Sequence, residues 1–187
     1  MKNIKMPRFL HELFGEETNQ KTLITTLVFS VVMTLFTAWL GQDHLATLRV
    51  YQLILLIILM VDIYGGIVAN FSVGTSKYYM KHPVLRRIFV IIHPHAFFIF
   101  LLSGMPWLYG LYSYAFLVAA SYITSRIPKR NLQELLAILF VLVGIIINFI
   151  LFKQVETYIR LLSLALIIKL IYAFSVEPIL LEEQLSI

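Results

Sequence analysis

YQLILLIILMVDIYGGIVANFSV, residues 51–73, is the stretch that decides the fold. It is longer than the about 20 apolar residues that a helix needs to cross the hydrocarbon core of a bilayer. The whole chain of 187 residues is 60% hydrophobic and only 13% charged, whereas soluble domains are about 45–50% apolar and about 25% charged. We therefore expect an all-α, polytopic transmembrane helical bundle and no second domain.

Six apolar stretches are predicted to cross the membrane: residues 23–40, 51–73, 88–102, 107–123, 132–152 and 158–174. The third and fourth are short, and only residues 103–106 separate them. They form either a tight hairpin of two thin spans, which we favour, or a re-entrant pair. Both alternatives return the chain to the same side.

The N-terminal residues 1–21 are predicted to form an amphipathic helix on the membrane surface. Apolar residues follow Pro7 at helical spacing there: Phe9, Leu10, Leu13 and Phe14. The alternative is a disordered tail. Residues 22–176 then make up the six-span domain, and residues 177–187 form a cytoplasmic C-terminal tail.

Lysine and arginine positions indicate the orientation. Of 15 such residues, 11 fall on the side of the N-terminus, three fall on the opposite side, and Lys169 lies within the last span. Because cytoplasmic loops carry an excess of these residues, both termini are expected in the cytoplasm. We expect a plasma-membrane location, with the cytoplasmic face against anionic lipid headgroups.

Two ionisable residues lie deep in the predicted spans. Asp62 and Lys169 are each 11 residues into a span, or about 16 Å at the helical rise, so both fall near the midplane. Because isolated charges are expensive there, we expect them to face each other as a pair. A purely structural pair is an alternative, as is Lys169 snorkelling to the cytoplasmic edge. Gly66 and Asn70 share the helix face of Asp62, and this face suits either close helix packing or a ligand.

A second polar layer is predicted nearer the cytoplasm, where Asn70, His93 and His95 reach one level. On a regular helix, the two imidazoles flanking Pro94 point about 200° apart and cannot bind one metal. No further histidine or carboxylate completes a metal motif. We therefore assign no metal and no cofactor.

The connection at residues 74–87 is rich in hydroxyl groups and cations. Its candidate residues for a phosphate or lipid headgroup are Thr75, Ser76, Lys77, Arg86 and Arg87. The alternative is that these cations only determine topology. Basic residues lie at membrane edges, so nucleic-acid binding is not expected.

Three classes of function remain open. The first is a small carrier or channel for a solute or ion, with Asp62 and Lys169 on its path. The second is an intramembrane enzyme acting on a lipid or isoprenoid, with acid–base chemistry at Asp62, His93 or His95. The third is a binding or assembly subunit of a membrane complex. We rank them in this order, without assigning catalytic residues. A six-span carrier without a visible repeat would require a homodimer.

Overall fold

The structure, a computed structural model, describes residues 3–176, except for the side chain of Arg87. Its N-terminal segment is a hairpin of strands β1 (Asn3–Lys5) and β2 (Glu17–Asn19), paired antiparallel. Between them lie two short helical turns, η1 (Arg8–Leu10) and α1 (His11–Phe14). The predicted helix is thus limited to these turns, because Gly15 adopts a φ of 75° and ends it. The predicted tail, residues 177–187, lies outside the described residues.

The N-terminal segment packs on α5 (Val73–Lys81). The Thr75 hydroxyl donates to the carbonyl of Leu13 at 2.6 Å. Gly74 approaches the segment so closely that a Cβ there would lie 2.3 Å from the carbonyl oxygen of Phe14. The segment is therefore fixed against the bundle.

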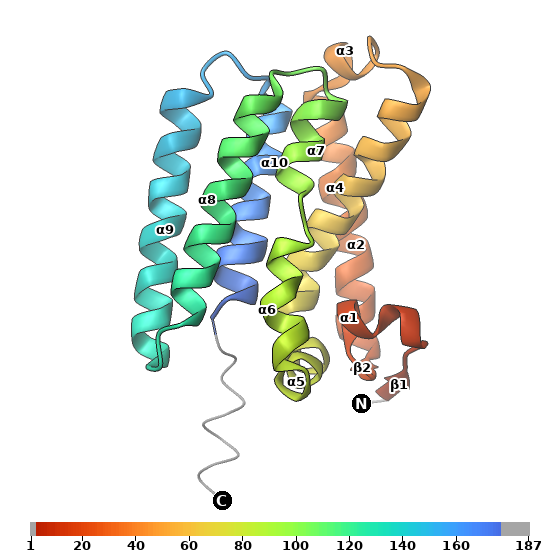
Figure 1. The fold of residues 1–187 in the computed structure, drawn as a ribbon. Helices are drawn as coiled ribbons and strands as arrows, with labels where there is room; N and C mark the ends of the chain where they lie inside the picture. Colours follow the sequence, from red (N-terminus) through yellow and green to blue (C-terminus); the bar gives the residue numbers. More distant parts are fainter. Residues whose placement is uncertain (1–2, 177–187) are drawn as a thin grey trace, which may run out of the picture.

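Long helices make up the rest of the fold (Figure 1). They are α2 (Gln20–Leu40), α4 (Val50–Asn70), α6 (Pro83–Ile91), α7 (His95–Leu102), α8 (Trp107–Ser125), α9 (Arg130–Leu151) and α10 (Thr157–Ile167), which continues as the π-helix η2 (Ile168–Phe174). The short α3 (Gln42–Leu45) joins α2 to α4. The connections after α2, α7 and α9 lie at one end of the bundle, and the N-terminal segment and the end of η2 lie at the other.

The membrane character of the protein is confirmed by five helices that are long and apolar enough to span a bilayer. These are α2, α4, α9, the combined stretch of α6 and α7, and the combined stretch of α10 and η2. The long helix α8, which is not among these five stretches, has 19 residues. Its tyrosines and serines lower its hydropathy below that of the five, although it packs against α7 and α9.

The third span differs in extent from the prediction. The sequence pattern placed its start at residue 88, but α6 begins at Pro83, which occupies the first turn of the helix. Together α6 and α7 cover Pro83–Leu102, 20 residues. Their path is interrupted between Ile91 and His95, so the span consists of two helices rather than one.

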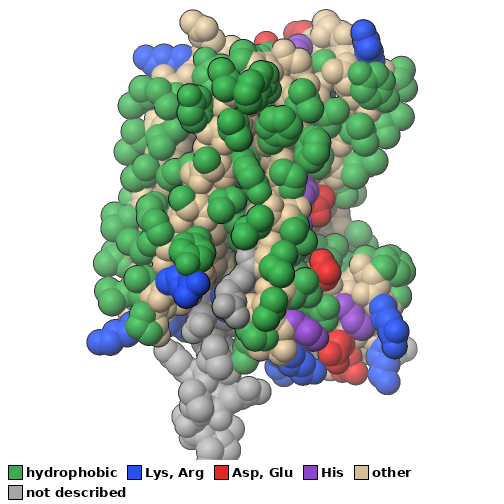
Figure 2. All heavy atoms as spheres, in the orientation of Figure 1, with side chains coloured by type: hydrophobic (Ala, Val, Ile, Leu, Met, Phe, Trp, Pro, Cys, Tyr) green, Lys and Arg blue, Asp and Glu red, His purple; other side chains and the backbone are tan. Residues whose placement is uncertain are grey.

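Apolar side chains cover the outside of the bundle (Figure 2). Leu35 of α2 and Ile146 of α9 are 65% and 55% exposed, a pattern that suits contact with lipid. The stretch of α10 and η2 is the central one, since it contacts α2, α4, α7, α8 and α9. Its side chains Leu162 and Leu166 are almost fully buried.

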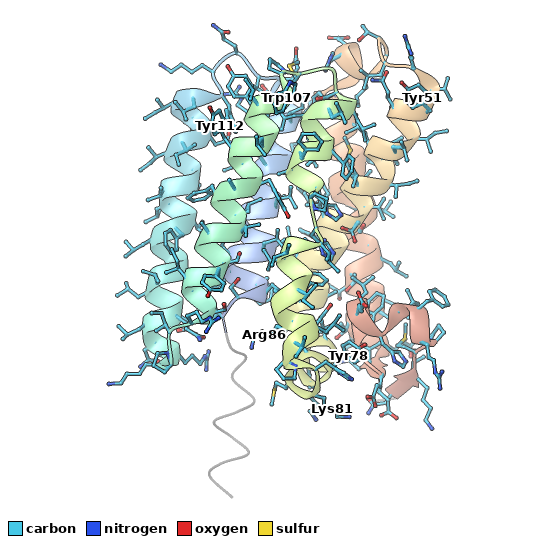
Figure 3. All side chains as sticks on the ribbon, in the orientation of Figure 1. Tyr51, Tyr78, Lys81, Arg86, Trp107 and Tyr112 are labelled. Carbon is cyan, nitrogen blue, oxygen red and sulfur yellow. The ribbon has the colours of Figure 1, made fainter. Side chains whose placement is uncertain are left out.

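Some aromatic side chains lie at the two ends of the bundle. Tyr51 and Trp107 lie at the end with the α2–α4 connection, and Tyr78 lies at the end with the N-terminal segment (Figure 3). Aromatic residues of membrane proteins are enriched at both interfaces with water.

Candidate functional site

Asp62 and Lys169 are in contact inside the bundle. Lys169 Nζ donates to Asp62 Oδ2 at 2.6 Å and to the Asp62 carbonyl oxygen at 3.2 Å. Lys169 is only 2% exposed, so its ammonium group depends on these oxygens instead of water. The Asp62 side chain is 38% exposed, and Figure 2 shows acidic and histidine side chains at the surface about half way along the bundle.

His95 contacts the same carboxylate oxygen. Its Nε2 lies 2.9 Å from Asp62 Oδ2, and because a carboxylate only accepts, Nε2 donates. In the neutral imidazole Nδ1 is then a bare acceptor. This Nδ1 is buried and has no hydrogen-bond partner among the described residues. Asp62 therefore fixes the orientation of the His95 ring through Nε2.

His93 completes the group, which we call the intramembrane cluster: Asp62, His93, His95 and Lys169. The rings of His93 and His95 stack with centroids 5.0 Å apart and planes at 11°. The Nδ1 of His93 donates to the carbonyl of Phe89 at 2.5 Å. The cluster thus joins residues of α4, α7 and η2 with the break before α7.

The break explains why the two rings are parallel. Pro94 has no N–H to donate, and its ψ of 33° departs from helical geometry. A regular helix would have placed the rings on opposite sides. The chain instead turns between α6 and α7, so both imidazoles reach the same side of the bundle.

Lys169 lies on an irregular element as well. The π-helix η2 widens the helix locally, a feature that occurs often at functional sites. Two serine hydroxyls, those of Ser121 and Ser175, donate to the carbonyl of Leu170 within it. Gly66 gives the lysine room, since a Cβ there would lie 2.3 Å from Lys169 Cε. The small residue at position 66 therefore accommodates a side chain of the cluster itself.

Asn70 lies apart from the two histidines. Its Nδ2 is 3.5 Å from the carbonyl oxygen of Lys169, and among the described residues no hydrogen bond joins it to His93 or His95. It lines a cavity of about 360 Å³ near the end of the bundle with the N-terminal segment. The predicted polar layer is thus divided between this cavity and the cluster.

Some of the residues predicted to bind a phosphate or lipid headgroup line this polar cavity. It is lined by Thr75, Ser76 and Arg86, together with Arg130 and Glu134. From the sequence, Arg130 contributes only to the assignment of topology. The i,i+4 spacing of Arg130 and Glu134 in the sequence is nevertheless a signal for the ion pair, whose atoms lie 2.6 Å apart in the structure.

The remaining headgroup candidates have different surroundings. Lys77 is exposed, and the side chain of Arg87 lies outside the described part. Arg86 donates to the carbonyls of Phe174, Ser175 and Val176 at 3.3–3.4 Å, which are the last residue of η2 and the two residues after it. Its position beside the end of the bundle is seen in Figure 3.

Tyr79 of α5 was not predicted as a site residue. It lines the polar cavity, is 4% exposed, and its hydroxyl has no partner within residues 3–176. Burial, with a smaller contribution from the charge of Glu12, raises the pKa of this phenol above its usual value. Tyr79 therefore stays protonated and offers a hydroxyl to the cavity. The sequence signal that could have identified Tyr79 is its place in a pair of adjacent tyrosines, Tyr78 and Tyr79, within a basic connection.

No group of three or more histidine, cysteine or acidic residues that could bind a metal occurs within the described residues. Compared with known proteins, the chain matches no family model, no curated protein and no solved structure.

Proposed function

We propose that this chain is a small membrane carrier or channel that moves protons through the intramembrane cluster. The observation that carries the proposal is the shared oxygen Asp62 Oδ2, which accepts from Lys169 at 2.6 Å and from His95 at 2.9 Å. Chains of carboxylates and histidines within membranes are typical of proton paths.

The contacts of the cluster support a proton relay. A proton that reaches Asp62 neutralises the carboxylate and leaves Lys169 as a buried charge without its counter-ion. Release of a proton from Lys169 removes that unpaired charge. The bare Nδ1 of His95 offers a second position for the proton. Each proton transfer changes the charges within the intramembrane cluster and so the attraction between its side chains. In this proposal the backbone changes conformation at the break before α7.

In this proposal the chain crosses the plasma membrane six times, with α7 and α8 as a crossing hairpin and both termini in the cytoplasm. The excess of cations at the end with the N-terminal segment supports this orientation. We further propose a homodimer. The Asp62 side chain is 38% exposed at the flank, where hydrocarbon would solvate it poorly, and a second copy would cover it.

The test is proton uptake by vesicles that contain the purified protein and an internal pH dye. A potassium gradient with valinomycin supplies the driving force. We expect faster uptake than in protein-free vesicles and a drop of about tenfold or more in His95→Gln. His82→Gln is the matched control, because His82 is exposed and lies outside the candidate spans. Equal rates in the wild type and His95→Gln, or a wild-type rate equal to that of empty vesicles, would contradict the proposal.

An intramembrane enzyme acting on a lipid is the second candidate, and the polar cavity favours it. That cavity combines Asn70, Arg86 and Arg130 with the hydroxyl of Tyr79, a set suited to a phosphate headgroup. Asp62 is eight residues from Asn70 on α4, or about 12 Å deeper. With the headgroup bound in the polar cavity, the part of the lipid beside the intramembrane cluster would be its chain.

The enzyme candidate is tested by incubating the protein with radiolabelled phospholipids and isoprenoid phosphates and separating the products. A new product that disappears in His95→Gln but persists in His82→Gln would favour this function. Unchanged substrates would exclude it for these lipids.

A further inference from the structure

A second cavity lies between α7, α8, α9 and α10, and none of its lining residues belongs to the intramembrane cluster or lines the polar cavity. Its volume is about 430 Å³, within the range of cavities that bind small molecules. Its lining residues, all described, include no lysine, arginine, histidine, aspartate or glutamate. An ionic headgroup would have no counter-charge there, so the lining suits an uncharged, mainly apolar molecule.

One buried polar side chain in this apolar cavity has no hydrogen-bond partner among the described residues. Ser163 of α10 is 4% exposed, lines the cavity, and its hydroxyl makes no hydrogen bond with the described residues. A buried hydroxyl without a partner is unfavourable. Asn148, also in the lining, is anchored, because its Nδ2 donates to the carbonyl of Arg160 at 3.3 Å. Ser163 is therefore the group that a bound molecule would satisfy.

The depth of Ser163 indicates how such a molecule would lie. It is six residues from the first residue of α10, Thr157, or about 9 Å along the helix. Tyr112, which also lines the cavity, lies toward the same end of the bundle (Figure 3). A molecule with its polar group at Ser163 would therefore have that group near the membrane edge and its chain toward the midplane.

Gly144 of α9 keeps the cavity wide. A Cβ at this position would lie 2.8 Å from Ile167 Cδ1 and 3.1 Å from Phe116 Cε1. Both neighbours are lining residues. A side chain at position 144 would push them into the cavity, and because the closest atom is the end of a flexible side chain, the helix packing can adjust.

We propose that this apolar cavity binds an uncharged, single-chain lipid whose one hydroxyl or carbonyl group pairs with the Ser163 hydroxyl. The absence of charge in the lining selects a neutral molecule, and the volume accommodates one chain. Ser163 supplies both a donor and an acceptor, so an alcohol and a ketone are equally suited to it. This site is independent of ion movement through the cluster.

The experiment uses the full chain in lipid nanodiscs and hexadecanol carrying a photoreactive diazirine near its hydroxyl end. After illumination, labelled peptides are mapped by mass spectrometry. We expect labelling to concentrate on residues 109–117, 144–152 and 163–167. Excess unlabelled hexadecanol and farnesol compete in separate arms, which distinguishes a straight chain from an isoprenoid chain.

Three variants and two altered probes make the result decisive. Ser163→Ala should reduce labelling about three- to tenfold, the effect of about one lost hydrogen bond. Ser30→Ala, which removes a buried hydroxyl on α2, should leave it unchanged. Gly144→Ala should also reduce labelling, and it tests the site if Ser163→Ala fails to fold.

The proposal would be overturned by any of three results. The first is equal labelling of the cavity by a diazirine-bearing hexadecane without a hydroxyl group. The second is stronger labelling by the corresponding phosphocholine. The third is labelling spread evenly over the exposed faces of α2 and α9, which would indicate partition into lipid alone.

Discussion

At the scale of single residues, the cluster depends on how closely α4 approaches Lys169. Gly66→Ala would bring a Cβ to 2.3 Å from Lys169 Cε and 2.8 Å from Nζ. We expect the ammonium group to move away from Asp62, lowering the free energy of unfolding by about 1–3 kcal/mol and slowing proton uptake. Thermal unfolding in detergent measures the first effect, and the vesicle assay measures the second.

The neighbouring glycine supplies the control for that prediction. A Cβ on Gly65 would have its nearest contact at 3.6 Å, with Ser30 Oγ. Gly65→Ala should therefore change stability by no more than about 0.5 kcal/mol. If both alanine variants behaved alike, Gly66 would have no special relation to Lys169.

The sequence supports part of the cluster and not the rest. Counting residues from the ends of two apolar stretches is enough to bring Asp62 and Lys169 to one depth, because helical rise is regular. The contact of His95 with Asp62 depends instead on the turn at Pro94, and its direction is decided by packing between helices. A regular helix gives the wrong geometry for the two histidines, so this part of the site required the structure.

At the scale of elements, the break between α6 and α7 aligns the two imidazoles. Pro94→Ala restores a backbone donor and removes the ring that prevents a continuous helix. We expect the helix to continue through position 94, His95 to turn away from Asp62, and proton uptake to fall while thermal stability is retained or increased. Helix content by circular dichroism and the vesicle assay follow the two changes.

Pro128 provides the matched substitution, because it lies exposed in the connection between α8 and α9. Pro128→Ala should leave proton uptake unchanged. Full uptake in Pro94→Ala would show that the cluster works without the break, contrary to the role assigned to it.

The length of the elements was only partly predictable. Hydropathy identified the apolar stretches of α2, α4, α9 and the last span, since each is continuous. It placed the start of the third span too late because Arg86 and Arg87 interrupt the apolar pattern within α6. The hairpin of β1 and β2 was not predicted, since three-residue strands carry no clear alternation.

At the scale of the whole molecule, the proposed topology is testable because the chain contains no cysteine. Single cysteines can be introduced without further changes as Asp43→Cys and Lys129→Cys, at opposite ends of the bundle. In intact cells, a membrane-impermeant maleimide should label the first and not the second. Both should react after the membrane is permeabilised.

That topology experiment has a clear opposite outcome. Labelling of position 129 alone in intact cells would indicate the opposite orientation, with both termini outside the cytoplasm. Equal labelling of both positions would be incompatible with a bundle that has these two ends on opposite sides of the membrane.

The proton uptake of the double variant Asp62→Asn/Lys169→Met tests the central claim most directly. Asp62→Asn alone leaves Lys169 as a buried, unpaired charge, and we expect it to lose about 3–5 kcal/mol of stability. Lys169→Met should lose less, because His95 still contacts the carboxylate. The double variant, which contains neither charge, should recover most of the stability. If the cluster moves protons, this stable protein takes up protons no faster than empty vesicles do. Uptake at the wild-type rate would mean that the pair only stabilises the bundle and would contradict the account.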